Sequence, residues 1–508
     1  MFPITINYAE IHFRYPFIKS KYYRKLPEII TDIPFRLSNR KIPILLIVKD
    51  ANSFPITINK ITAFIKSKNG DFEETFPIEK TINDDYFSEI FFYEIPEAIQ
   101  ENQYLSLDIK INCFTENKRY SFINDNYLTL DRKSFSTYFA NKKFPYPKNW
   151  FAGEAHFHSN FTNDQVEFGS DIYSTSIMAK SIGLDWFFVT DHSYDLDDRP
   201  DDYTKNDSSI PKWHQMWKDV ETYDSEKMRI IGGEEVSIGN TLNQNVHLLH
   251  LNSKKFIEGF GDSGDSFIHK NPTHSIKDLK ELGNDNSLFI AAHPFEKVPI
   301  SQKIILKRGN WNVRDFTTSK IHFVQAINSN LQSDIFPGIR KWEELLFNNF
   351  KAILIAGNDS HGNFNFMKQI KIPFLKLFIS RKQIFGQFHT IFFNDENDPI
   401  QGLKNKNIVV SNGPFLSFFL ESKGVKYNIG SEIDFGVFIL KYQAKSSEEF
   451  GEIKKIKLII GTISNQKKRI IINPPNNYKI EIKQNSFLRM ELLTNKRGFV
   501  FTNPIWTK

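Results

Sequence analysis

The stretch Trp186-Phe187-Phe188-Val189-Thr190-Asp191-His192 places an acidic residue and a histidine directly after a short apolar run. An apolar run of this length predicts a β-strand that is buried on both faces, as in a parallel sheet. The same arrangement recurs at residues 230–235, 289–293 and 353–361, where each apolar run leads into acidic residues or histidines. In α/β barrels the carboxyl ends of the strands converge on one rim, so these polar side chains are expected to meet there.

The region around this stretch alternates apolar runs with helical ones, which is typical of a barrel-like α/β domain. The apolar runs predict strands at residues 184–190, 228–231, 246–251, 288–292, 322–327 and 352–356. The helical runs predict helices at residues 174–182, 211–223, 276–282 and 338–347.

Segments with β-strand signals flank this region on both sides. Between residues 41 and 136, alternating apolar runs are separated by turn signals such as Asn69-Gly70, which predicts a β-sandwich. The Pro-containing stretch 144–150 predicts a linker, and the alternating pattern returns beyond residue 411. We therefore predict three domains: a sandwich-like β domain at 1–145, the α/β domain at 146–410 and a small β-rich domain at 411–508.

The overall composition narrows the classes of function. The 508 residues carry a formal net charge of only +6, a field too weak to favour nucleic-acid binding. Cys113 is the only cysteine, which excludes intramolecular disulfides, cysteine-based zinc sites and iron–sulfur clusters. The first residues lack the pattern of a signal peptide, and no stretch has the roughly 18 apolar residues of a membrane span. We expect a cytoplasmic protein without a membrane partner.

Two histidines stand at i and i+2 in Gly153-Glu154-Ala155-His156-Phe157-His158. On a strand this spacing points both imidazoles to one face, so both can bind one metal ion. Six of the thirteen histidines belong to the set expected to converge, and they are His156, His158, His192, His247, His293 and His361. Without cysteine ligands, the pattern predicts a centre for Zn, Mn or Fe with nitrogen and oxygen ligands.

Five separated motifs in this region resemble those of the polymerase and histidinol phosphatase (PHP) superfamily of metal-dependent phosphoesterases, and they occur in the same order. These motifs are residues 191–198, 233–237, 245–249, 292–296 and 357–365, and the resemblance covers about residues 150–365. The sequence more closely resembles the CehA/McbA-type branch, which is named for carbamate hydrolases. The C-terminal segments Ser411-Asn412-Gly413-Pro414-Phe415 and Thr502-Asn503-Pro504-Ile505 share in this resemblance.

This resemblance implies a distorted (β/α)7 barrel of the PHP type that holds two or three divalent ions. It implies that one ion is bound by His156, His158, Glu235 and Asp359. A second ion is expected at His247 and His293, with Glu235 as the carboxylate that bridges the two ions. A third ion is expected at His192, His361 and an aspartate early in the chain.

Three of the expected roles depend on register. The early aspartate usually falls where this chain has Asn163, so Asp164 is the expected ligand if the chain bulges, and otherwise the centre holds two ions. Neighbours on a strand face opposite ways, and the family register favours Glu235 over Glu234 as the ligand. Asp191 is expected to orient an imidazole or, alternatively, to cap the following turn.

The expected reaction is hydrolysis by a metal-activated water, without a nucleophilic side chain. The substrate is expected to be a small-molecule ester, phosphoester or carbamate/amide, and the sequence does not separate these chemistries. Lys297, Lys307 and Arg308 would suit a phosphate, or they are surface charges. Trp213 and Trp217 share a helix face and belong either to a lid or to the core.

Two other functions remain open at this stage. One is a non-catalytic, metal-stabilised binding or scaffold protein, although the complete ligand set argues against it. The other is a nucleic-acid processing phosphoesterase, against which the weak net charge counts. The oligomeric state is left open.

Overall fold

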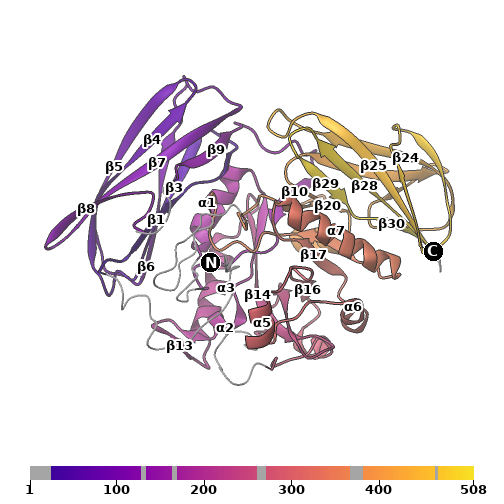
Figure 1. Ribbon diagram of the computed structural model, residues 1–508, viewed down its shortest axis with the longest axis horizontal. Helices are drawn as coiled ribbons and strands as arrows, with labels where there is room; N and C mark the ends of the chain where they lie inside the picture. Colours follow the sequence, from indigo (N-terminus) through magenta and orange to yellow (C-terminus); the bar gives the residue numbers. More distant parts are fainter. Residues whose placement is uncertain (1–24, 128–132, 163–168, 260–270, 367–381, 464–466) are drawn as a thin grey trace, which may run out of the picture.

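The computed structural model describes residues 25–127, 133–162, 169–259, 271–366, 382–463 and 467–508. Strands dominate both ends of the chain, and the central part combines strands with helices. Figure 1 shows the two groups of strands side by side, with the central part between and below them. Within these described ranges, no helix is both long and apolar enough to cross a membrane.

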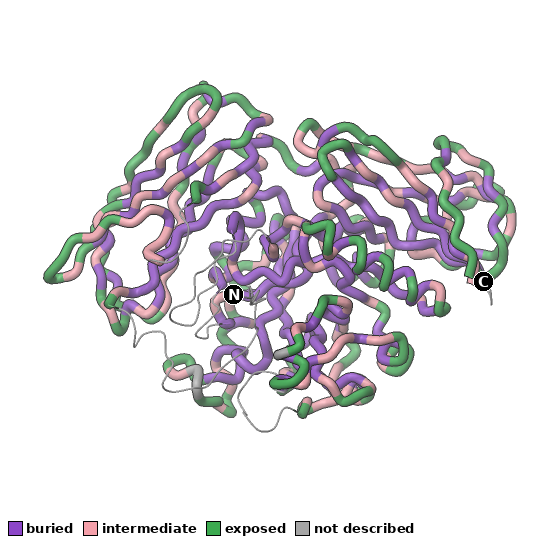
Figure 2. The backbone as a smooth tube through the Cα atoms, viewed as in Figure 1, coloured by how far each residue is buried: buried purple, intermediate pink, exposed green. Residues whose placement is uncertain are grey.

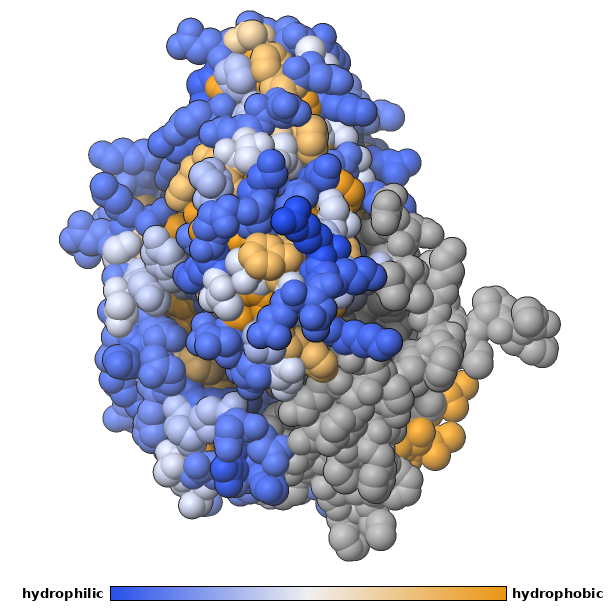
Figure 3. All heavy atoms as spheres, turned by 90° about the vertical axis from the view of Figure 1, so that its left-hand side faces the viewer, coloured by the Kyte–Doolittle hydropathy of each residue, from blue (hydrophilic) through white to orange (hydrophobic). Residues whose placement is uncertain are grey.

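Two sheets form the N-terminal region and face each other across an apolar cluster. The first sheet consists of β1 (Glu28–Asp32), β3 (Lys41–Lys49) and β6 (Tyr86–Glu94). The second has the order β2 (Arg36–Leu37), β9 (Phe135–Phe139), β7 (Gln103–Thr115), β4 (Ile56–Ser67) and β5 (Gly70–Ile82), with β8 (Lys118–Ile123) beside β7. Buried and more exposed residues alternate along β7, as expected for a strand with one face on a core. Figure 3 views this side of the molecule, and its surface is mainly hydrophilic.

The central region is mixed α/β, which confirms that part of the prediction. Its sheet has the order β18 (Ile353–Ala356), β17 (Phe323–Ile327), β16 (Leu288–Ala291), β15 (Asn245–Leu251), β14 (Arg229–Gly239), β11 (Trp186–Val189), β10 (Trp150–Glu154) and β19 (His389–Phe393). The helices are α1 (Ile172–Ile182), α2 (Ser193–Leu196), α3 (Pro211–Tyr223), α4 (Leu279–Leu282), α5 (Ile300–Ile305), α6 (Val313–Ser319), α7 (Gln332–Phe347) and α8 (Pro399–Lys404). A short hairpin, β12 (Asp198–Arg199) and β13 (Asp202–Asn206), precedes α3. The central strands are buried along most of their length (Figure 2).

Local sequence explains where α1 begins and ends. The Asp171 carboxylate accepts a hydrogen bond of 2.8 Å from the backbone N–H of Ser174, which caps the first turn. Gly183 ends the helix with φ 103°, a left-handed conformation that favours glycine. The predicted helices at 174–182 and 211–223 are found, whereas of the one predicted at 276–282 only α4 is helical.

The predicted (β/α)7 barrel is not what the structure shows. The strand ladder of the described residues is open, and β15 pairs antiparallel with both β14 and β16. A short turn joins β14 to β15, which leaves no room for the crossover that parallel neighbours need. Closure would also require a free edge on β10, but β19 pairs with that edge in antiparallel fashion. A single bridge between Phe157 and Ser360 links the segments that follow β10 and β18.

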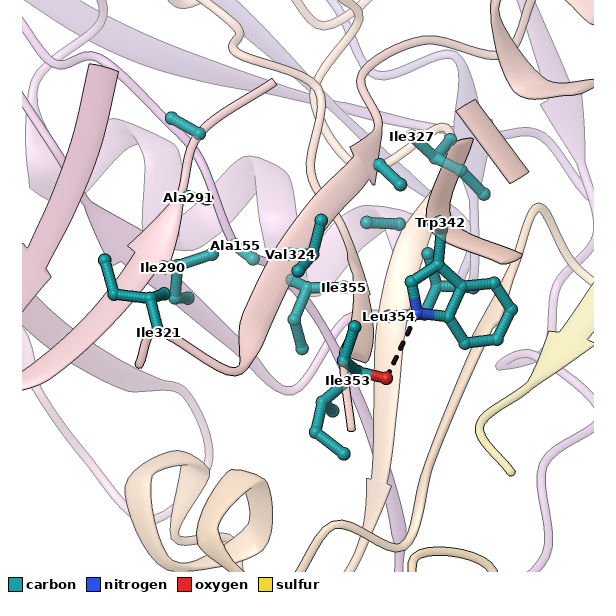
Figure 4. Packing of buried hydrophobic residues seen from close by; sticks show 14 of the residues in the cluster. Ala155, Ile290, Ala291, Ile321, Val324, Ile327, Trp342, Ile353, Leu354 and Ile355 are labelled. Carbon is teal, nitrogen blue, oxygen red and sulfur yellow. Dashed lines mark hydrogen bonds between the residues drawn. The ribbon is translucent and has the colours of Figure 1, made fainter. Parts of the chain in front are cut away.

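Helix α7 covers one end of this sheet, and Figure 4 shows the contact. The indole of Trp342 packs against Leu354 and neighbouring apolar side chains, and its N–H donates to the carbonyl of Ala352 at 3.1 Å. Gly338 permits the close approach, because a Cβ atom there would lie 1.9 Å from the carbonyl oxygen of Ala326 in β17. The packing of α7 on the sheet therefore depends on the large side chain of Trp342 and on the absence of a side chain at Gly338.

The C-terminal strands continue the central sheet. Strand β19 pairs with β20 (Ile408–Ser411), and the ladder goes on through β29 (Phe499–Thr502), β28 (Ser486–Thr494), β25 (Ile453–Thr462) and β26 (Lys468–Ile472). A second sheet contains β22 (Val425–Asn428), β21 (Phe415–Ser422), β24 (Gly436–Lys445) and β27 (Tyr478–Ile482), while β23 (Glu432–Ile433) pairs with β30 (Ile505–Thr507). The boundary predicted at residue 411 thus falls within a continuous ladder, and the division into three domains stays a prediction.

Arg36 joins the three parts of the chain. Its guanidinium pairs with Glu449 at 2.9 Å and donates to the carbonyls of Ile182 and Lys142 at 2.7 and 2.8 Å. The ring of Phe144 lies 4.3 Å from the guanidinium carbon. The Arg36 and Glu449 side chains are 1% and 8% exposed, so water does not replace these contacts.

We predict that Arg36→Ala lowers the free energy of unfolding by roughly 3–5 kcal/mol, because Glu449 would remain buried without its charge partner. Urea denaturation followed by tryptophan fluorescence measures the change. Lys41→Ala is the control, since it breaks an ion pair with Glu94 whose side chains are 59% and 61% exposed. That control should lose less than about 1 kcal/mol. Equal losses in the two variants would contradict the prediction.

Candidate metal centre

The predicted strand ends do converge in the described part of the chain. His156 and His158 follow β10, and this segment is bound to the one after β18, since His158 N–H donates to the Ser360 carbonyl at 2.9 Å. Glu235 lies on β14, and it pairs across the hairpin with Leu249 on β15. The remaining ligand candidates follow β11, lie on β15, or follow β16 and β18, and they are His192, His247, His293, Asp359 and His361.

Four of these side chains form one compact group: His156, His158, Glu235 and Asp359. The Nε2 atoms of His156 and His158 lie 3.1 Å apart. His158 Nε2 is 3.0 Å from Asp359 Oδ1, and His156 Nε2 is 3.3 Å from Glu235 Oε2. All four side chains are at most 1% exposed.

Two further groups share members with the first. His192, Glu235 and His247 form one of them, and His158, His192 and His361 form the other. Glu235 is the common carboxylate, since its Oε1 lies 2.9 Å from both His247 Nδ1 and His293 Nε2. Its Oε2 lies 3.2 Å from His192 Nδ1. One carboxylate therefore faces imidazoles from four different segments.

The protonation of His156 follows from its neighbour Gln325. Gln325 Nε2 donates to Asn328 Oδ1 at 2.7 Å, which places the amide oxygen of Gln325 toward His156. That oxygen lies 2.8 Å from His156 Nδ1 and can only accept, so Nδ1 carries the proton. The Nε2 of a neutral His156 therefore directs a lone pair toward the carboxylates.

The same reasoning applies to His158. The Thr162 hydroxyl donates to Asp191 at 2.8 Å, so its oxygen is left to accept from His158 Nδ1 at 3.4 Å. The Nε2 lone pairs of His156 and His158 then point at each other and at two carboxylates. This arrangement is repulsive unless a cation lies between these atoms.

Polar atoms without hydrogen bonds mark the same place. Both ring nitrogens of His192 and the Oε2 of Glu235 are buried and have no hydrogen-bond partner among the described residues. Buried polar atoms normally have a hydrogen-bond partner, so a group of buried polar atoms without one indicates that a further ligand binds among them. Nitrogen and oxygen donors at these separations fit a divalent transition metal. The buried histidines and carboxylates could thus hold a metal ion.

The pKa shifts of His158 and Glu235 also indicate that the cluster favours additional positive charge. Burial acts to lower the pKa of His158, but the carboxylates of Asp359 and Glu235 outweigh it and raise that pKa well above its usual value. Burial acts to raise the pKa of Glu235, yet the imidazoles of His247 and His156 hold it well below its usual value. Without a metal, a proton on the imidazoles would supply the missing charge.

Glu234 and Glu235 point in opposite directions, as strand geometry requires. The Glu234 carboxylate lies 3.0 Å from His250 Nδ1 and accepts from the backbone N–H of Ile257 at 2.9 Å. Burial raises the pKa of Glu234 well above its usual value. Glu234 and His250 therefore form a separate buried pair, and Glu235 alone of the two faces the cluster.

Asp191 acts on the loop after β10 and not directly on an imidazole. Its carboxylate accepts from the Ser159 backbone and hydroxyl, each at 2.7 Å, and from the Thr162 backbone at 3.1 Å. Through the Thr162 hydroxyl it also fixes the orientation of His158. Asp191 thus orients the ring indirectly, and the alternative of a cap on the following turn is not found, because its carboxylate bonds the earlier loop at Ser159 and Thr162.

The sequence analysis missed Glu154, which is fully buried. Its carboxylate accepts from the backbone N–H groups of His156, Asn358 and Gly386 at 3.0, 2.8 and 2.8 Å. It thereby ties together the segments that carry His156 and Asp359, and burial raises its pKa to about 7. The signal was present, since Glu154 stands two residues before His156, at the same spacing as His156 and His158.

Two other expectations concern the rim. Asp164 lies outside the described residues, so its role as a ligand of a third ion stays a prediction. Trp213 is 1% exposed and packs edge-on against Phe256 and Trp217, which makes it a core residue and not part of a lid.

Comparison with known proteins does not identify the chain. No protein-family model matches it, and no curated protein matches its sequence. Among solved structures it is similar to a beta-D-mannosidase from Dictyoglomus thermophilum, with 9% identity, a TM-score of 0.21, and 95% of this chain and 67% of that chain covered. A Parabacteroides merdae beta-glucuronidase gives 7% identity, a TM-score of 0.18, and 95% and 64% coverage. TM-scores this low indicate no common fold, so these similarities assign neither fold nor function.

We predict that Gln325→Leu lowers metal affinity about 10–100-fold, because His156 loses the acceptor that fixes its tautomer. Competition with a metal chelator, monitored for the purified protein, measures the affinity. Gln215→Leu is the control, since Gln215 is exposed on α3 and bonds only locally to Asp219. Unchanged affinity in the Gln325 variant would show that the amide does not set the tautomer.

Proposed function

We propose that this protein is a metal-dependent hydrolase that holds two or three divalent ions, Zn, Mn or Fe, in the cluster around Glu235. The observation that carries the proposal is the convergence of buried imidazole lone pairs and carboxylate oxygens described above. The motif order that resembles the PHP superfamily supports the same conclusion. A divalent ion bound here would supply Lewis acidity and would lower the pKa of water toward neutrality.

The protein's own residues supply position and charge. Glu235 faces both halves of the cluster and is the carboxylate suited to lie between two ions. Gln325 and Thr162 keep His156 and His158 in the tautomers that present Nε2. No described serine or cysteine is needed as nucleophile, because water is the second reactant.

Arg308 favours a phosphoester over a carbamate or amide as substrate. Its Nη2 lies 3.4 Å from His247 Nδ1, and the residue is only 8% exposed. Lys297 is exposed, and Lys307 donates to Asn271 on the surface at 2.7 Å, so of the three candidate cations only Arg308 reaches the cluster. Two divalent ions already exceed the charge of the two carboxylates Glu235 and Asp359. An additional guanidinium is compatible with an anionic substrate and unfavourable beside a neutral one.

The backbone holds Arg308 in this place. Arg308 forms a bridge with Asn245, two residues before His247 on β15, and Gly309 N–H donates to the Asn245 carbonyl at 2.8 Å. The Trp311 indole donates to the His247 carbonyl at 3.1 Å. A side chain anchored so close to a ligand strand is suited to bind substrate.

A scaffold protein with structural metals remains the second candidate function. Structural sites usually have all positions of the metal filled by protein ligands, whereas catalytic sites keep one open. A cluster served by eight described ligand candidates, with Arg308 beside it, fits the catalytic alternative better.

We predict that His156→Ala and Asp359→Ala each abolish hydrolysis and sharply reduce the bound metal, because each removes a donor from the compact group. Elemental analysis by inductively coupled plasma mass spectrometry and assays on phosphoester, carbamate and amide substrates measure the two effects. His322→Ala is the control, since His322 comes directly before β17, whereas the candidate ligands on neighbouring strands follow the strand ends, and its ring bonds to the Lys351 carbonyl. Full activity in either ligand variant would overturn the proposed site.

We predict that Arg308→Ala lowers kcat/KM for phosphoesters roughly 10–100-fold, the loss of a charge-assisted hydrogen bond of about 1.5–3 kcal/mol. Metal content should stay unchanged, and hydrolysis of any neutral ester substrate should change little. Lys307→Ala serves as the control from the adjacent position. A phosphoesterase activity that survives Arg308→Ala intact would remove the argument for an anionic substrate.

A further inference from the structure

Helix α5 presents an apolar face to solvent beside the proposed metal centre. Ile300, Lys303 and Ile304 lie at positions i, i+3 and i+4 and therefore share one face. Ile300 and Ile304 are each 77% exposed, the highest values among the large hydrophobic side chains of the described residues. Gln302 and Leu306 are buried, so the helix is anchored by its inner side while the isoleucines face outward.

Two neighbouring segments extend this apolar surface. Leu242, at the β14–β15 turn, is 64% exposed, and Val313, at the start of α6, is 38% exposed. These segments are joined, because the backbone N–H of Thr241 donates to Asp315 at 2.8 Å. Figure 1 places α5 and α6 on the same side of the molecule. We call this the α5–α6 surface, and its exposed apolar members are Leu242, Ile300, Ile304, Ile305 and Val313.

The same surface is strongly basic. Between Lys297 and Lys320 there are five lysines and arginines that are not buried, besides the buried Arg308, against one acidic residue, Asp315. Asp315 is buried and is used in the capping box of α6, so it does not neutralise the surface. Lys297, Lys303 and Arg314 are exposed, like the isoleucines. Exposed isoleucines among cations are the features with which peripheral proteins bind anionic lipids.

We propose that the α5–α6 surface docks on an anionic phospholipid surface. The isoleucines would enter the boundary between headgroups and acyl chains, while the lysines would remain with the phosphates. Nucleic acid is the less suitable occupant for two reasons. Exposed aliphatic side chains do not contribute to phosphate binding, and stacking against bases requires aromatic side chains. The expectation of no membrane partner rested on the lack of a spanning stretch, which does not bear on peripheral binding. The backbone N–H of Arg308 donates to the carbonyl of Gln302 in α5 at 3.3 Å, and the Arg308 guanidinium lies 3.4 Å from His247, so docking would bring the metal centre close to the lipid.

Co-sedimentation of the full chain with vesicles tests the proposal without any assay of hydrolysis. The protein should bind vesicles that contain phosphatidylglycerol and should not bind pure phosphatidylcholine, and added salt should weaken the binding. Ile300→Ser combined with Ile304→Ser should reduce binding by roughly tenfold or more, because two inserted side chains are lost. Metal content should not change in this variant.

Phe435→Ser combined with Val437→Ser is the matched control, because these side chains are 63% and 49% exposed but lie at the start of β24 in the C-terminal region. The control should bind like the unaltered protein. Absence of binding to anionic vesicles, or equal binding by both double variants, would overturn the proposal. Sedimentation velocity provides a second discriminating result. A dimer that forms without lipid and is lost only in the Ile300/Ile304 variant would assign the surface to a second copy of the chain instead.

Discussion

The concentration of buried negative charge and nitrogen lone pairs around Glu235 is the constraint on which the rest of the structure depends. Glu235 and Asp359 are at most 1% exposed, and their oxygens lie 3.0–3.4 Å from Nε2 of His156 or His158. Burial of charged groups without compensation costs several kcal/mol per ion. A divalent cation bound at the centre would turn each of these contacts into an attractive one, and without it a proton on the imidazoles would supply the positive charge.

The chain around the cluster is irregular where it carries two of the candidate ligands. His293 and Asp359 have positive φ angles of 26° and 50°, conformations that non-glycine residues seldom adopt. Such strain persists only where the surroundings determine the conformation. Glu154 provides much of that determination for Asp359, since it binds the backbone N–H of Asn358, the preceding residue. Asp191 acts similarly on the segment after His158.

The sequence predicted the convergence of these side chains better than it predicted the sheet. Apolar runs that end in histidines or carboxylates are local signals. Strand alternation predicted that only one of Glu234 and Glu235 faces the cluster, and the choice of Glu235 came from the resemblance to the PHP superfamily. The barrel prediction was wrong because β19 pairs with β10 although the two strands are more than two hundred residues apart, and no local pattern reports such a pairing. Gln325 escaped notice for the same reason, since it contacts His156 across 169 positions.

The flanking strands hold the segments of the α/β region that carry the candidate ligands Asp359 and His361. The Asp32 carboxylate accepts from Phe364 N–H at 2.9 Å, and Asn365 exchanges two hydrogen bonds with the backbone of Ser136. Both contacts hold the segment that follows Asp359 and His361. At the other end, Asn503 binds the backbone of Leu354 within β18 through both atoms of its amide. The strand that leads to Asp359 is thus held from the C-terminal side, and the loop after it from the N-terminal side. Displacing either contact would move Asp359 or His361, whose positions the proposed metal centre requires to be accurate to a fraction of an ångström.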